Sequence, residues 1–134
     1  MEKKDLKPAG VFKYFEEICQ VPRPSKKEEK MIAYLKAFGA KHNLETKVDE
    51  AGNVLIKKPA TPGKENLQTV VLQSHIDMVC EKNNDVQHDF LTDPIETEID
   101  GEWLKAKGTT LGADNGIGVA TELAILADDT IEHG

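Results

Sequence analysis

A histidine and an aspartate follow an apolar run near the middle of the chain. In the stretch VVLQSHIDMVC, residues 70–80, the apolar residues 70–72 lead into His75 and Asp77. Residues two apart in an extended segment point to the same side, so these two side chains would project together. The imidazole could bind a divalent metal, and the carboxylate could bind it as well or hold the ring in place. The alternative is a histidine at a strand end with an aspartate that caps the following turn.

A glycine-rich stretch later in the chain surrounds a second carboxylate. Gly112, Gly116 and Gly118 fall within seven residues, and Asp114 lies between them. Glycines let a backbone turn sharply and approach another group closely. The spacing matches neither the dinucleotide fingerprint nor the P-loop, and Asp114 would repel a phosphate. A carboxylate in such a loop suits a cation better, although a purely structural turn into a helix remains open.

Composition and charge limit the class of protein. The 134 residues suffice for one domain, and the formal net charge of -7 comes from 17 basic and 24 acidic residues. This balance disfavours nucleic acid as a partner. No apolar run has the length of a membrane span, and the first residues do not form a signal peptide, so we expect a cytoplasmic protein that does not contact a membrane. Cys19 and Cys80 are then expected to be free thiols.

Hydrophobic periodicity predicts helices that alternate with strands. A buried strand over 69–73 would place His75 and Asp77 just beyond its carboxyl end, where α/β sheets bind ligands. The predicted fold class is therefore α/β, an α/β/α sandwich with a mixed β-sheet. The other expected elements are helices over 11–19 and 116–127, a helix that opens with a capping box of Ser25 and Glu28 and fades near 39–43, and hairpins over 46–57 and 95–106.

Long stretches of the chain resemble one enzyme family. VVLQSHIDMVCEKNNDVQHDF and DGEWLKAKGTTLGADNGIG are similar to sequences of the aminoacyl-histidine dipeptidases (peptidase D, carnosinase-like), which are co-catalytic zinc metallopeptidases. QVPRPSKKEE and DEAGNVLIKKPAT match the same family upstream. The resemblance covers nearly the whole chain and implies a dinuclear zinc dipeptidase that hydrolyses Xaa-His dipeptides of the carnosine type.

The resemblance also implies a role for each of the three polar residues. His75 resembles the first zinc ligand, and Asp77 resembles the catalytic carboxylate that orients the metal-bound histidine. Asp114 resembles the carboxylate that bridges two zinc ions, and the bond from Asp114 to Asn115 is a candidate cis peptide. The implied partners are a small peptide substrate and a second subunit in a homodimer.

One part of the family pattern has no counterpart in the chain. The family uses a Glu-Glu pair as general base and metal ligand, whereas Glu16-Glu17 and Glu28-Glu29 fall in early helices. We therefore expect residues 1–134 to be the N-terminal portion of the catalytic domain, without its lid or dimerisation domain and inactive alone. The alternatives are a non-enzymatic module that binds an anion or a partner, and a related peptidase or deacylase of different specificity.

Overall fold

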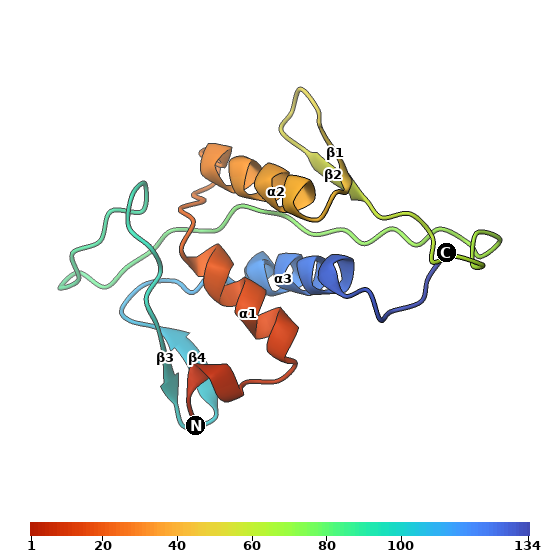
Figure 1. Ribbon diagram of the computed structural model, residues 1–134. Coiled ribbons are helices and arrows are strands. Elements are labelled where there is room, and N and C mark those ends of the chain that lie inside the picture. The colour runs from red at the N-terminus through yellow and green to blue at the C-terminus, as the bar shows by residue number, and fades with distance from the viewer.

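The computed structural model describes all 134 residues and contains three α-helices and two separate hairpins (Figure 1). A short 3₁₀ helix, η1, precedes them. Both hairpins are antiparallel, β1 with β2 and β3 with β4. The elements in chain order are η1 (Lys3–Asp5), α1 (Ala9–Cys19), α2 (Glu29–Lys41), β1 (Glu45–Val48), β2 (Val54–Lys57), β3 (Thr97–Asp100), β4 (Trp103–Ala106) and α3 (Ala113–Ala127).

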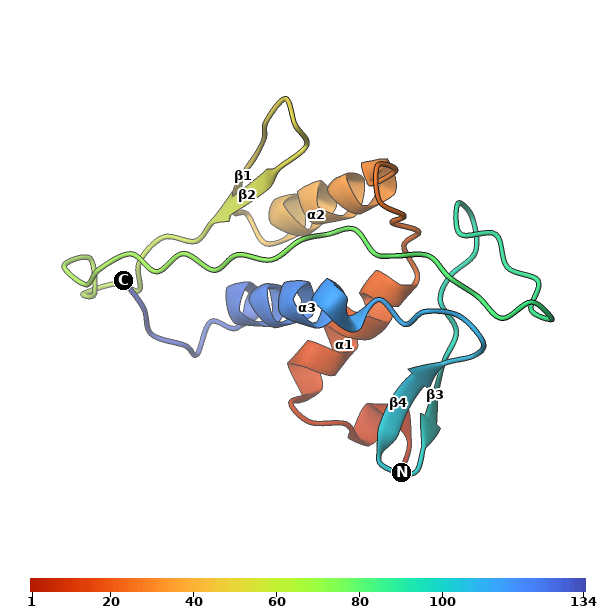
Figure 2. The same ribbon diagram turned by 180° about the vertical axis from the view of Figure 1, so that it is seen from behind.

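Helices α1 and α3 pack against each other and form the centre of the molecule (Figures 1 and 2). Apolar residues three and four apart put one face of α1 into the core, where Phe15 and Ile18 are almost completely enclosed. Val119, Ala120 and Leu123 form the facing surface of α3. A single hydrophobic core results, because buried residues of α2, together with Met78 and Ile95, join the same cluster.

Helix α2 packs on the first hairpin. A β-carbon at Gly39 would overlap the side chain of Thr46, so the glycine permits close contact between α2 and β1. The predicted capping box is wrong. Helix α2 begins at Glu29, the residue before it makes no side-chain cap, and the hydroxyl of Ser25 bonds to Asp77 instead.

The second hairpin is confirmed and lies close to the N-terminus, away from α2 and the first hairpin (Figure 2). The hydroxyl of Thr97 in β3 donates a 2.6 Å hydrogen bond to Glu16 of α1, and the backbone N–H of Ile95 bonds to the carbonyl of Cys19. These contacts attach the hairpin to the C-terminal part of α1, next to the link between α1 and α2.

The predicted strand over 69–73 does not form. Residues 68–77 make no backbone-to-backbone hydrogen bond, and the side chains of Val70 and Val71 are 74% and 80% exposed. The segment runs across the molecule between α2 and α3 without a strand on either side (Figures 1 and 2). The α/β class is correct, but the sheets are two antiparallel hairpins, because nothing in these residues pairs with the central segment. None of the helices combines the length and the apolarity needed to cross a bilayer.

Candidate metal centre

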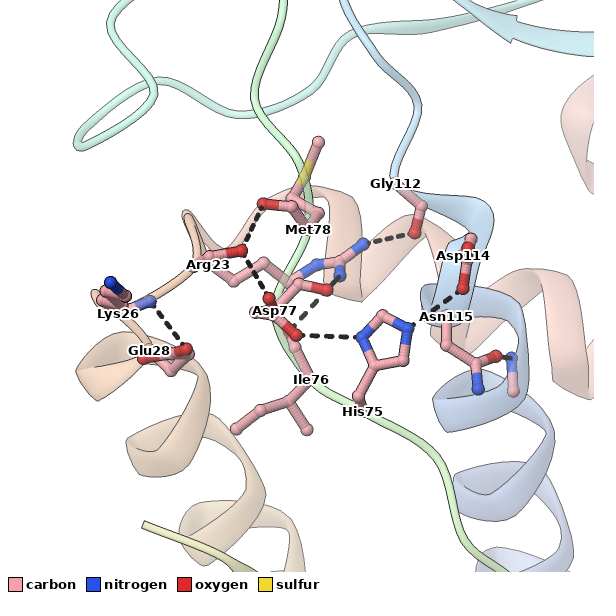
Figure 3. Close-up of polar contacts among 12 residues, drawn as sticks. Arg23, Lys26, Glu28, His75, Ile76, Asp77, Met78, Gly112, Asp114 and Asn115 are labelled. Carbon is pink, nitrogen blue, oxygen red and sulfur yellow. Dashed lines mark hydrogen bonds and ion pairs between the residues drawn. The ribbon is translucent and has the colours of Figure 1, made fainter. Parts of the chain in front are cut away.

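His75 lies at the end of the unpaired segment and faces two carboxylates (Figure 3). Its Nδ1 atom is 2.9 Å from Oδ1 of Asp77, and its Nε2 atom is 3.0 Å from Oδ1 of Asp114. Both ring nitrogens donate when the imidazole carries two protons, so Asp114, followed by Asp77, raises the pKa of His75 above its ordinary value. The ring is 52% exposed, which leaves it open to a ligand from solvent.

Both carboxylate oxygens of Asp77 are already engaged. Oδ1 accepts from the His75 ring, and Oδ2 accepts from the hydroxyl of Ser25, in the link between α1 and α2. The hydrogen bond from Ser25 is the main cause that lowers the pKa of Asp77. Because the carboxylate is held from both sides, this arrangement favours a role in orienting His75 over a role as a free metal ligand.

Asp114 projects from the irregular start of α3. Asp114 and Asn115 have non-helical backbone angles, and the peptide bond between them is cis, as the resemblance predicted. The regular helix begins at Gly116, where the side chain of Asn115 caps it by accepting a 3.1 Å bond from the N–H of Gly118. The carboxylate of Asp114 therefore stands just ahead of the helix, and its side chain is 96% exposed.

Two residues that the sequence patterns did not single out as functional also support the site. Arg23 is 2% exposed and bonds to backbone carbonyls on both sides of the site, at Ile76, Asp77 and Gly112. The sequence predicts Ser25 as a helix cap, whereas the structure shows it bonded to Asp77. The sequence feature that could have indicated both residues is that Arg23 is the only arginine in the chain and Ser25 follows it closely, in VPRPS.

The donor atoms fit a zinc site in part. Two ligand atoms on one tetrahedral zinc ion lie about 3.3 Å apart, close to the observed separation of Nε2 and Oδ1. When Nδ1–H of His75 donates a hydrogen bond to Asp77, the lone pair of Nε2 points toward Asp114. Histidine ligands held by a carboxylate have the same arrangement. No group of three or more His, Cys, Asp or Glu side chains is arranged to hold a metal ion. His75 and Asp114 would thus supply only two of the three or four ligands that zinc takes.

Known proteins have a similar sequence and fold. The chain is 51% identical over 133 residues, 99% of its length, to the cytosol non-specific dipeptidase of Escherichia coli (strain K12). It superposes over its full length on the crystal structure of aminoacylhistidine dipeptidase from Vibrio alginolyticus, with a TM-score of 0.96 and 54% identity. The chain is similar to dipeptidases from end to end. The resemblance predicted from the sequence motifs is therefore confirmed.

The chain spans only part of these dipeptidases, 27% of the length of each. A tripeptidase from Staphylococcus aureus subsp. aureus Mu50 and aminopeptidase PepT from Bacillus cereus ATCC 10987 match 93% of the chain, with TM-scores of 0.74 and 0.75 at 22% and 23% identity. At this identity the two peptidases share the fold alone. No family model matches the chain.

Proposed function

We propose that the chain is the N-terminal portion of the catalytic domain of a dinuclear zinc dipeptidase that hydrolyses Xaa-His dipeptides. The observation that carries the proposal is the position of the His75 ring, between Asp77 on one nitrogen and Asp114 on the other. The high identity to two dipeptidases supports a peptide substrate. One relative is named a non-specific dipeptidase and the other an aminoacylhistidine dipeptidase, so a panel of substrates tests the preference for histidine.

Each residue has a separate task in this proposal. His75 would hold a zinc ion through Nε2, and Asp77 would keep the ring in the required tautomer by accepting a hydrogen bond from Nδ1–H. Asp114, exposed at the start of α3, has a free oxygen with which to bridge a second ion. Zinc held by these residues would supply Lewis-acid chemistry, polarising the scissile carbonyl and lowering the pKa of a bound water toward neutrality.

A general base and further ligands must come from other residues. The carboxylate of Asp77 is occupied by Ser25 and His75, which leaves it poorly placed to take a proton from water. We infer that residues 1–134 alone bind zinc weakly and hydrolyse dipeptides negligibly, and that a Glu-Glu pair elsewhere in a longer protein completes the site. A cytoplasmic location, supported by the word cytosol in the name of the E. coli relative, and a homodimer belong to the same proposal.

The test is an assay of a chain extended to the length of its relatives, with zinc, on carnosine, other Xaa-His dipeptides and dipeptides without histidine. His75→Ala should abolish turnover and lower the zinc content measured by atomic absorption. His88→Ala is the matched control, because His88 lies in the loop before β3, where its ring contacts Phe90 and not the site. This variant should retain both the turnover and the zinc content. Turnover that a chelator does not affect, or a His75→Ala enzyme with full zinc and full rate, would contradict the proposal.

The alternative of an anion-binding glycine loop has less support. A β-carbon at either Gly112 or Gly116 would lie within 2.7 Å of the Arg23 guanidinium, so the side chain that these glycines make room for is part of the protein itself. Phosphate should therefore leave the melting temperature of the chain unchanged, whereas binding of phosphate at an anion site would raise that temperature.

A further inference from the structure

Arg23 is a buried cation without a carboxylate partner. Its side chain is almost completely enclosed, and no ion pair involves it among the salt bridges of the structure. Burying a charge is costly unless hydrogen bonds compensate for the lost water. Here three backbone carbonyls provide that compensation, so the position of the guanidinium is determined by the two segments to which these carbonyls belong.

The guanidinium bridges the two halves of the candidate metal centre (Figure 3). Nη1 donates to the carbonyls of Ile76 and Asp77, each at 3.3 Å, and Nη2 donates to the carbonyl of Gly112 at 2.7 Å. The first two carbonyls directly follow His75, and the third precedes Asp114 by two residues. The backbone carbonyl of Arg23 also accepts a 3.0 Å bond from the N–H of Met78. One residue thus fixes the His75 segment and the Asp114 loop to the same point.

The glycine loop is shaped around this side chain. A β-carbon at Gly112 would lie 2.6 Å from Nη2 of Arg23, and one at Gly116 would lie 2.7 Å from it. Gly112 also has a φ of 76°, in the region that favours glycine. The absence of side chains at both positions lets the start of α3 approach the guanidinium, and this approach sets the distance between α3 and the 75–77 segment.

We propose that Arg23 is a positioning residue that holds His75 and Asp114 at the separation required for a metal ion between them; this inference rests on the proposed function. Residues 68–77 make no backbone-to-backbone hydrogen bond, so side-chain contacts such as those of Arg23 must hold the segment in place. The planar fork of an arginine donates from separate nitrogens in a fixed geometry, whereas a lysine ammonium donates from a single nitrogen and does not span the same distance. Charge alone is therefore not sufficient, and Arg23→Lys should fail to reproduce the arrangement.

The experiment uses the 134-residue chain and two variants, Arg23→Lys and Gly116→Ala. The second variant keeps the arginine but puts a methyl group against Nη2, and it removes a glycine from a helix, which should favour the helix itself. Leu35→Ala is the control, because it weakens the core far along α2 without touching the site. Nuclear Overhauser contacts between the His75 ring and Asp114 report the positioning without metal, and zinc titration followed on the His75 ring resonances reports the affinity.

Both variants should lose the contacts between His75 and Asp114 and bind zinc about 10–100-fold more weakly, while Leu35→Ala retains both. The inference is overturned if the two variants keep the contacts between His75 and Asp114 and the zinc affinity of the unmodified chain. It is also overturned if Leu35→Ala loses the contacts and the affinity to the same extent. If Arg23→Lys does not fold, Gly116→Ala decides. If the unmodified chain binds no zinc but the variants still lose the contacts, residues 1–134 do not suffice for a metal site and the positioning role of Arg23 stands.

Discussion

The hydroxyl of Ser25 donates a hydrogen bond to Oδ2 of Asp77, across 52 residues of sequence. The other oxygen of Asp77 accepts from the His75 ring at 2.9 Å. Ser25 belongs to the link between α1 and α2, so a segment outside the two candidate ligand stretches holds the carboxylate that contacts the histidine. The candidate site depends in this way on residues outside the two stretches that contain its ligands.

Removing this hydroxyl should weaken metal binding. In Ser25→Ala the Asp77 carboxylate can rotate and no longer fixes His75, so zinc affinity should fall about tenfold. Ser25→Thr keeps a hydroxyl at an exposed position and should bind zinc nearly as the unmodified chain does. Competition with a chromophoric zinc indicator measures both. Equal affinities for Ser25→Ala and the unmodified chain would show that Asp77 does not need Ser25.

The carboxylate of Asp114 should matter for the metal and hardly at all for stability. Its side chain is 96% exposed, so Asp114→Asn should change the free energy of unfolding by less than about 0.5 kcal/mol while removing most of the zinc affinity. Asp129→Asn is the matched control, since Asp129 is 94% exposed and lies beyond the other end of α3. The idea fails if both variants bind zinc equally well in the same indicator assay.

Two leucines provide a test of where stability resides. Leu35 on α2 is 5% exposed and belongs to the core, whereas Leu55 on β2 is 58% exposed. Leu35→Ala should lower the free energy of unfolding by about 2–5 kcal/mol, because it removes buried methyl groups and leaves a cavity. Leu55→Ala should cost less than about 0.5 kcal/mol. Urea denaturation followed by circular dichroism distinguishes them, and similar midpoints would contradict the core assignment.

The elements that the sequence predicted correctly are those determined by local patterns. Apolar spacing placed the helices 9–19 and 113–127 within a few residues, and Asp100-Gly101 located the second hairpin. The His75 and Asp114 side chains, 39 residues apart, were paired by the family resemblance and not by spacing. Their close approach in the structure agrees with that pairing, while their role as metal ligands stays a prediction.

The features that the sequence did not predict depend on distant contacts. Ser25 and Glu28 have the spacing of a capping box, but the hydroxyl finds a better acceptor in Asp77. The residues next to Arg23 in the sequence do not indicate the three distant carbonyls that its side chain contacts. The run over 69–73 was apolar enough for a central strand, yet an apolar run indicates only that a segment favours burial and not which residues will cover it.

The two cysteines should differ in reactivity. Burial raises the pKa of the Cys19 thiol to about 12, and burial raises the pKa of Cys80 as well, although Cys80 is more accessible. The thiolate is the reactive form, so iodoacetamide at pH 8.5 should label Cys80 slowly and Cys19 hardly at all. Mass spectrometry locates the label, and urea should equalise the labelling rates of the two cysteines. Faster labelling of Cys19 in the folded chain would contradict its burial.

The buried thiol of Cys19 should also make stability depend on pH. Unfolded thiols titrate near pH 8.5, so folding retains the Cys19 proton, and the free energy of unfolding should fall as the pH rises from about 8.5 toward 12.

The unpaired segment 68–77 should make the chain self-associate. Its residues make no backbone-to-backbone hydrogen bond, and Val71 is 80% exposed, so the segment resembles an uncovered strand edge. Sedimentation equilibrium should therefore show association that increases with concentration, and Val71→Lys should weaken it by placing a charge on the segment. Val48→Lys is the control, because Val48 is 40% exposed but its strand already pairs with Val54. Equal association of both variants would place the contact elsewhere on the surface, and a monomer at every concentration would show that the segment does not pair with a second copy.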